Sequence, residues 1–189
     1  MSREKAELRK KLIEQRKSKS EAMFIKKSQK ITNILLHLTA FQQAQHILFY
    51  VSNNGEVHTH KLIKKLLSSN KSIYVPLSEP KTHTLMISIL HHFEDLTKST
   101  YGILEPKKEK QEIVPIDSIE LIIVPGVGFD PLGHRIGQGG GYYDWLLSKT
   151  KATSIALAFE FQILDFIPTG PHDQLVDIII TENQVINCK

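Results

Sequence analysis

Cysteine is almost absent from this sequence of 189 residues. The one cysteine, Cys188, stands next to the last residue. A single thiol forms no internal disulfide and supplies no cysteine-based zinc site, so both are excluded. A reducing compartment is the simplest setting for such a chain, and we therefore expect a cytoplasmic protein.

Long apolar runs are also missing. Leu121–Val124 is among the longest, and it falls far short of the roughly 20 residues that a membrane helix needs. The first five residues carry charge with no apolar stretch behind them, so we expect no signal peptide. Hydrophobic residues make up 41% and charged residues 23% of the chain, which excludes a disordered protein. The length predicts a single domain over residues 1–189. Because long apolar runs are missing, we expect no membrane partner.

Acidic residues are scarce at the start, where residues 1–30 hold four Asp and Glu against eleven Lys and Arg. The whole chain carries +4, so this arm carries +7 and the remaining 159 residues carry −3. A basic arm, which we extend to about residues 1–38, is typical of an anionic partner: nucleic acid, a membrane surface or a phosphorylated small molecule. A solvated, lysine-rich helix face gives the same pattern. Phe24 is the one aromatic residue of the first thirty, which argues against a nucleic-acid-binding module.

Hydrophobic periodicity predicts strands that alternate with helices. Ser2 and Ser20 each begin a predicted helix in the basic arm, and Thr59 begins another. Residues 142–149 form a further predicted helix. Strands are predicted at residues 46–51, 72–75, 84–90, 121–124, 153–158 and 177–181, with the second ending at Pro76. We interpret residues 91–118 as a long surface connection. The alternation predicts an α/β fold with an open, largely parallel sheet flanked by helices.

The most informative segment is rich in glycine. It holds five of the ten glycines within nine residues, Gly133–Gly141, between a predicted strand and a predicted helix. Glycines let the backbone turn sharply and approach a ligand closely. The positive end of the next helix and the guanidinium of Arg135 would add attraction for phosphate. The segment lacks the Gly-Lys-Ser/Thr of a P-loop and the spacing of a dinucleotide fingerprint. It predicts a phosphate-binding loop of another kind.

This segment and its flanks resemble a known family. Val124–Asp130, then Gly133, then Arg135–Asp144, closely resemble the signature of 5-formyltetrahydrofolate cyclo-ligases, also called methenyltetrahydrofolate synthetases. Similar stretches occur in the same order at Lys5–Arg9, Tyr101–Pro106 and 162–182. The resemblance spans nearly the whole chain. It implies an open α/β sheet of the type shared with sugar-phosphate isomerases and CoA transferases.

The resemblance also implies a reaction. Members of the family use ATP and Mg²⁺ to convert 5-formyltetrahydrofolate to 5,10-methenyltetrahydrofolate, releasing ADP and phosphate. The formyl oxygen attacks the γ-phosphate, N10 closes the ring, and phosphate departs. Phosphorylation turns a poor leaving group into a good one, and the protein has to position the reactants and neutralise charge. We expect small-molecule substrates, no nucleic acid, and a monomer.

The resemblance assigns roles to individual positions. Arg135 and Tyr142 match catalytic positions, and Asp144 and Asp173 match carboxylates that bind Mg²⁺. Two carboxylates with phosphate oxygens and water are a usual Mg²⁺ environment. The implied nucleotide contacts are Lys5, Arg9, Arg135, Gly137, Gln138, Gly139, Gly140, Gly141, Tyr142 and Tyr143, and the implied folate contacts are Val51, Glu56, Gln138 and Tyr142. Trp145 stands where bacterial members of the family often carry a basic residue, and Gln138 replaces a residue that is sometimes basic.

Plainer interpretations stay open for the acidic residues. Asp173 also fits as a turn cap beside Pro171, and Glu56 as an exposed turn residue. Asp144 in the first turn of a helix is favourable without any metal. Two other functions fit parts of the sequence: a sugar-phosphate isomerase-like enzyme would explain the phosphate loop, and a nucleic-acid-binding module would explain the basic arm.

Overall fold

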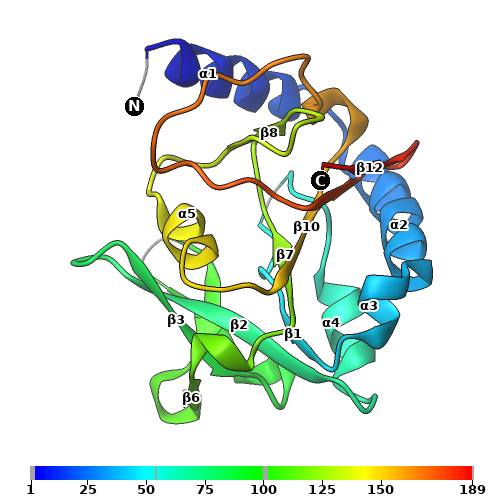
Figure 1. The fold of residues 1–189 in the computed structure, drawn as a ribbon. Helices are drawn as coiled ribbons and strands as arrows, with labels where there is room; N and C mark the ends of the chain where they lie inside the picture. Colours follow the sequence, from blue (N-terminus) through cyan, green and yellow to red (C-terminus); the bar gives the residue numbers. More distant parts are fainter. Residues whose placement is uncertain (1–2, 54, 100–101, 189) are drawn as a thin grey trace.

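A twisted β-sheet forms the centre of the computed structural model, which describes residues 3–53, 55–99 and 102–188 (Figure 1). Within these residues, eight strands lie in the order β12-β11-β10-β7-β1-β2-β3-β6. The bounds are β1 (His46–Leu48), β2 (Ser72–Glu79), β3 (Thr84–Ile89), β6 (Ile113–Val114), β7 (Leu121–Val124), β10 (Thr153–Leu157), β11 (Ile178–Ile180) and β12 (Val185–Asn187). The five strands from β11 to β2 are parallel, and β12, β3 and β6 pair antiparallel. The prediction of an open, largely parallel sheet is confirmed.

Helices cover both faces of the sheet. α2 (Glu21–His37), α3 (Thr39–Gln43) and α4 (His60–Leu66) lie on one face, and α5 (Tyr142–Leu147) lies on the other (Figure 1). The burial of strand β7 explains why its sequence is apolar throughout. Leu121 and Ile123 pack in the core under α2 and α4, whereas Ile122 and Val124 pack in the core that contains α5. A strand buried on both faces has no position for a polar side chain.

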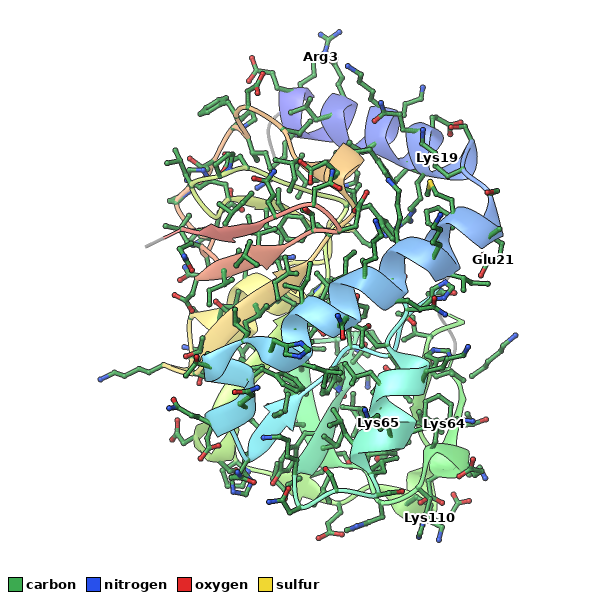
Figure 2. The ribbon with its side chains drawn as sticks, turned by 90° about the vertical axis from the view of Figure 1, so that its right-hand side faces the viewer. Arg3, Lys19, Glu21, Lys64, Lys65 and Lys110 are labelled. Carbon is green, nitrogen blue, oxygen red and sulfur yellow. The ribbon has the colours of Figure 1, made fainter. Side chains whose placement is uncertain are left out.

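The basic arm folds into two helices, α1 (Arg3–Lys17) and α2. The Ser20 hydroxyl accepts a hydrogen bond from the amide of Met23, so Ser20 caps α2 as predicted. Ser2, the predicted cap of the first helix, lies outside the described residues. Figure 2 shows α2 running diagonally across the molecule, with α1 above it. No helix in the described part of the chain is both long and apolar enough to cross a membrane.

The structure corrects the prediction that a strand ends at Pro76. Strand β2 continues to Glu79, and Pro76 pairs with Ile87 of β3. The amide of Phe49 donates to the carbonyl of Tyr74, so Tyr74 and Pro76 turn their backbone polar groups toward β1. Because β1 pairs only as far as Tyr74, the missing N–H of Pro76 interrupts no ladder.

The predicted strand at 46–51 is too long, because the chain leaves the sheet after Leu48. The Thr59 hydroxyl donates to the carbonyl of Tyr50 at 2.9 Å and accepts from the amide of Ser52 at 3.0 Å. These bonds draw residues 50–52 away from β2. Thr59 stands at the start of α4, but it makes no side-chain cap there. Its hydroxyl shapes the loop at the end of β1 instead.

The interpretation of residues 91–118 as a surface connection is wrong in part. β4 (Leu96–Lys98) and β5 (Leu104–Pro106) form a separate antiparallel pair, and β6 is the edge strand of the main sheet. The Glu105 carboxylate accepts a hydrogen bond from the amide of Ser78 in β2 at 3.0 Å. This bond ties the small sheet to the large one. Tyr101, part of the stretch that resembles the family, lies outside the described residues.

Candidate active site

A cavity of about 1330 Å³ opens at the carboxyl ends of β1 and β7, the edge where open α/β sheets bind ligands. Tyr50 and Val51 follow β1, and Pro125 and Gly126 follow β7. All fourteen residues that the sequence predicts for the site line this one cavity: Lys5, Arg9, Val51, Glu56, Arg135, Gly137, Gln138, Gly139, Gly140, Gly141, Tyr142, Tyr143, Asp144 and Asp173. The placement joins segments from both ends of the chain. It leaves the individual roles as predictions.

The glycine-rich segment forms one wall in a conformation that depends on its glycines. Its first residues belong to a short hairpin, β8 (Gly128–Phe129) and β9 (Arg135–Ile136), that the sequence did not predict. Gly139 has φ +105° and Gly141, which precedes α5, has φ +73°. Residues other than glycine rarely adopt these φ values. A Cβ at Gly140 would lie 2.7 Å from the ring of Tyr142, so a larger residue there would require the ring to move.

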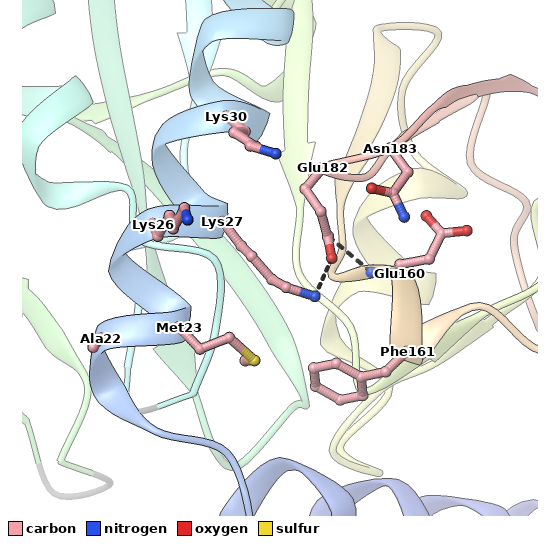
Figure 3. A pocket seen from close by; sticks show the side chains of 9 residues that line it. All are labelled: Ala22, Met23, Lys26, Lys27, Lys30, Glu160, Phe161, Glu182 and Asn183. Carbon is pink, nitrogen blue, oxygen red and sulfur yellow. Dashed lines mark hydrogen bonds and ion pairs between the residues drawn. The ribbon is translucent and has the colours of Figure 1, made fainter.

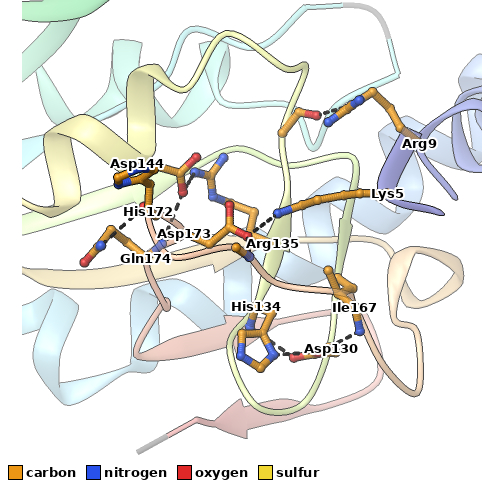
Figure 4. A network of polar contacts seen from close by, with 12 residues as sticks. Lys5, Arg9, Asp130, His134, Arg135, Asp144, Ile167, His172, Asp173 and Gln174 are labelled. Carbon is orange, nitrogen blue, oxygen red and sulfur yellow. Dashed lines mark hydrogen bonds and ion pairs between the residues drawn. The ribbon is translucent and has the colours of Figure 1, made fainter. Parts of the chain in front are cut away.

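Two cations of α1 reach the walls of the cavity, Arg9 at the glycine-rich segment and Lys5 at the loop that holds Asp173 (Figure 4). Lys5 Nζ lies 2.6 Å from Asp173 Oδ2, and Arg9 Nε donates to the carbonyl of Gly137 at 2.6 Å. Burial acts to raise the pKa of Asp173, but hydrogen bonds from Lys5 and from the Gly170 amide outweigh it and hold that pKa below its usual value. Lys5 and Arg9 of the basic arm therefore face the cavity, whereas other cations of the arm, such as Arg3 and Lys17, are exposed to solvent.

Arg135 and Asp144 form a second ion pair inside the cavity. Arg135 Nη2 lies 2.8 Å from Asp144 Oδ1, and the Arg135 side chain is only 4% exposed. Arg135 Nε is buried and has no hydrogen-bond partner in the described chain. Arg135 thus retains a buried donor without an acceptor in the described chain, and an anionic ligand would supply one.

The two carboxylates predicted to bind Mg²⁺ are thus both paired with cations. No group of three or more His, Cys, Asp or Glu side chains in the described ranges has the arrangement of a metal site. The protein alone therefore offers too few ligands. Asp144 and Asp173 fit a Mg²⁺ ion that takes its other ligands from phosphate and water.

Glu56 lies at another part of the cavity and is half-buried rather than displayed on an exposed turn. Its Oε2 accepts a hydrogen bond from the amide of Asn53 at 2.8 Å. Burial raises the pKa of Glu56, while that hydrogen bond and the charge of Arg16 act in the opposite direction. Glu56 therefore presents an acceptor within the cavity.

Sequence reasoning missed a buried carboxylate that supports the wall of the cavity. Asp130 is fully buried and accepts hydrogen bonds from the amides of Leu132, His134 and Ile167 at 3.0–3.1 Å, and its Oδ2 lies 2.9 Å from His134 Nδ1. It fastens the hairpin that carries Arg135 to the loop that leads to Asp173 (Figure 4). The resemblance included Asp130 but gave it no role, and burial of an aspartate has no local sequence signal. Arg16, Tyr50, His83 and Glu105 also line the cavity and were not predicted.

A second cavity, of about 830 Å³, lies between α2 and the 3₁₀ turn η4 (Glu160–Gln162) (Figure 3). None of the predicted site residues lines it. Lys27 of α2 pairs there with Glu182, whose side chain is 4% exposed and whose Oε2 accepts from the amide of Glu160 at 2.9 Å. Part of the positive charge of α2 is thus used to join the helix to the end of the sheet.

The fold and the main cavity define a class of protein: an open-sheet α/β protein whose ligand site is walled by a glycine-rich segment and a basic N-terminal helix. A family model described as the 5-formyltetrahydrofolate cyclo-ligase family matches residues 1–182. The chain belongs to the 5-formyltetrahydrofolate cyclo-ligase family and is a ligase, which confirms the resemblance seen in the sequence.

Individual relatives agree with this assignment. A 5-formyltetrahydrofolate cyclo-ligase of Haemophilus influenzae is 34% identical over 158 residues, which cover 80% of this chain and 84% of the relative. The solution structure of a 5,10-methenyltetrahydrofolate synthetase of Aquifex aeolicus has a TM-score of 0.87 and 32% identity, and covers 98% of this chain and 93% of its own. The structure of a 5,10-methenyltetrahydrofolate synthetase of Mycoplasma pneumoniae is 23% identical, with a TM-score of 0.75. The match covers 94% of this chain and 98% of the synthetase and shows the same fold.

Proposed function

We propose that this protein converts 5-formyltetrahydrofolate to 5,10-methenyltetrahydrofolate, with ATP consumed and ADP and phosphate released. One observation carries the proposal. A single cavity brings together a glycine-rich segment, cations from α1 and a half-buried carboxylate, Glu56, in a chain of the cyclo-ligase family. Such a cavity offers donors for phosphates and an acceptor for a heterocycle at once.

The glycine-rich wall supports ATP as the phosphate donor. Arg135 and the backbone of Gly137–Gly141 face the cavity, and Lys5 and Arg9 approach from α1. Backbone amides and guanidinium groups together bind phosphate oxygens well. Gln138, Tyr142 and Tyr143 lie along the same wall. We assign these residues to the nucleotide, with Gln138 and Tyr142 also touching the folate.

Asp144 and Asp173 would hold Mg²⁺ beside the phosphates. The ion neutralises phosphate charge and allows two carboxylates to lie close to a polyanion that they would otherwise repel. In the structure, Arg135 forms an ion pair with Asp144, and Lys5 forms one with Asp173. When the anion binds, both cations gain a second acceptor.

Val51 and Glu56 would bind the folate. Two adjacent N–H groups of a pterin ring are donors, and a carboxylate accepts both. The formyl oxygen on N5 attacks the γ-phosphorus of ATP, the bond to the bridging oxygen breaks, and ADP leaves. N10 then attacks the formyl carbon, its proton passes to water, and the carbon–oxygen bond breaks as phosphate departs with the former formyl oxygen. Arg135 neutralises charge on the transferred group, and Tyr142 positions it.

Further features follow from the proposal. We propose that residues 1–189 act as one domain and as a cytoplasmic monomer that binds neither nucleic acid nor membrane. Lys5, Arg9 and Lys27 of the basic arm all contact the body of the protein, which supports a small anionic ligand over a nucleic acid. We also propose that the sheet is of the sugar-phosphate isomerase and CoA transferase type.

Near-ultraviolet absorbance tests the function. Mixing the protein with 5-formyltetrahydrofolate, ATP and Mg²⁺ should produce the methenyl chromophore, and leaving out any of the three should prevent it. Arg135→Gln should abolish the signal, whereas Lys149→Gln, an exposed change outside the cavity, should not. No chromophore from folded wild-type protein would contradict the proposal.

A further inference from the structure

Arg16 is a cavity residue to which neither the glycine-rich wall nor the metal site gives a role. It lies in the last turn of α1 and lines the same cavity as Lys5 and Arg9. Positions 5, 9 and 16 are four and seven residues apart, so all three lie on one face of the helix. Lys5 contacts Asp173 and Arg9 contacts Gly137, whereas Arg16 lies farther along α1.

The Arg16 side chain is laid against the loop that carries Glu56. Its Cδ would lie 2.7 Å from a Cβ built on Gly55, a glycine with φ +75°. A residue with a side chain at position 55 would displace the arginine. The close approach brings the guanidinium near Glu56, where its charge acts against the burial that raises the pKa of that carboxyl.

The guanidinium is not fully satisfied by the protein. Arg16 Nη1 is buried and has no hydrogen-bond partner among the described residues. Buried donors in proteins are nearly always paired, so an unpaired donor on a residue that lines a cavity has capacity for an acceptor that a ligand brings. The ligand atom must be an acceptor, because a guanidinium only donates.

We propose that Arg16 is a substrate-recognition residue that donates to a ring carbonyl oxygen whose neighbouring N–H groups bind Glu56. Arg16 and Glu56 then form one edge with a donor beside an acceptor. This edge complements the pyrimidinone ring of a reduced pterin, in which a carbonyl oxygen lies beside two N–H donors. The inference rests on the proposed function and extends its folate site to a residue from α1.

Equilibrium binding separates this role from others. Dissociation constants for 5-formyltetrahydrofolate and for ATP are measured separately by calorimetry for wild type, Arg16→Gln, Arg16→Lys and Lys17→Gln. Lys17 is the matched control, because it is 68% exposed in the same turn and pairs with Glu14. We expect Arg16→Gln to weaken folate binding at least tenfold, about 1.4 kcal/mol, with ATP binding changed less than twofold. The folate affinity of Arg16→Lys should lie between those of wild type and Arg16→Gln, because lysine keeps a charged donor. Lys17→Gln should bind both substrates as wild type does.

The pH dependence of folate affinity gives a readout that a purely structural role would not change. Arg16 from α1, Tyr50 after β1 and Tyr143 of α5 are titratable groups that interact with Glu56. Loss of the positive charge raises the pKa of Glu56 further, so affinity in Arg16→Gln should already fall at a higher pH than in wild type as the pH is lowered. Arg16→Lys should keep the wild-type profile.

Two results would overturn the assignment: equal folate binding by wild type and Arg16→Gln, or equal losses of folate and ATP affinity in both Arg16 variants. The second result would mean that Arg16 only holds α1 in place. If wild-type protein itself fails to bind 5-formyltetrahydrofolate, the proposed function fails as well. If Arg16→Gln does not fold, the same comparison is made with Arg16→Lys, for which a threefold or greater loss confined to folate is expected.

Discussion

Replacing Arg9 by alanine tests whether α1 takes part in nucleotide binding. Arg9 Nε donates to the carbonyl of Gly137 at 2.6 Å, and its guanidinium carbon lies 3.8 Å from a Cβ built on Gly139. The side chain therefore fixes the part of the glycine-rich segment that we assign to phosphate. A hydrogen bond from a charged group contributes about 1.5–3 kcal/mol. Because 1.4 kcal/mol is a factor of ten, the KM for ATP should rise between about tenfold and about a hundredfold.

The assay is steady-state formation of the methenyl chromophore with each substrate varied in turn. The KM for 5-formyltetrahydrofolate should change less than threefold, since Arg9 lies on the glycine-rich side of the cavity. Lys10→Ala is the control, because Lys10 is exposed on the next position of the same helix. Equal increases in both KM values would show that Arg9 holds the fold together. An unchanged KM for ATP would refute the assignment of α1 to the nucleotide.

Three other predictions address the metal, acid stability and the thiol. Asp144→Asn should shift the Mg²⁺ dependence of turnover to higher concentration and lower the maximal rate, and Asp173→Asn should have the same effects more weakly. Mg²⁺ titrations that superimpose on wild type would contradict this. Burial acts to raise the pKa of Glu182, but the hydrogen bond from Lys27, the backbone hydrogen bonds and the charge of Lys27 together outweigh it and lower that pKa, so the stabilisation is present at neutral pH and lost as the pH falls through the lowered value. Glu182→Gln should therefore cost about 1.5–3 kcal/mol in urea unfolding at pH 7 and flatten the acid decline, and an unchanged acid decline would show that Glu182 does not set it. Burial, then the charges of Asp130 and Asp177, raise the pKa of the Cys188 thiol to about 11, so a disulfide reagent at pH 7 should modify it about a hundredfold more slowly than a free cysteine; equal rates would refute it.

The parallel core of the sheet was predictable because its strands are apolar on both faces. Leu121–Val124 matches β7 residue for residue. The misses have physical reasons. β8, β9 and β12 have two or three residues each, too few to show a period of two. Pro76 was interpreted as the end of a strand, because the sequence does not show that its nitrogen faces the side where β1 has already ended.

The site was predictable in part from residue chemistry and in part only from resemblance. The glycines and Arg135 indicate phosphate by themselves. Lys5 and Asp173 are 168 positions apart, and no local pattern brings them together. Arg16 was missed because it stands in a helix crowded with lysines and arginines, where spacing alone does not show which cations turn inward. Only the tertiary fold separates the cations that line the cavity from those in solvent.

The stoichiometry of phosphate release tests the central claim most directly. Purified protein is mixed with 5-formyltetrahydrofolate, ATP and Mg²⁺, and the methenyl product and inorganic phosphate are measured in the same samples. Activation of the formyl oxygen by phosphoryl transfer requires one phosphate for each ring closed, and labelled oxygen from the formyl group should appear in that phosphate. Ring closure without phosphate release, or phosphate that lacks the label, would contradict the account.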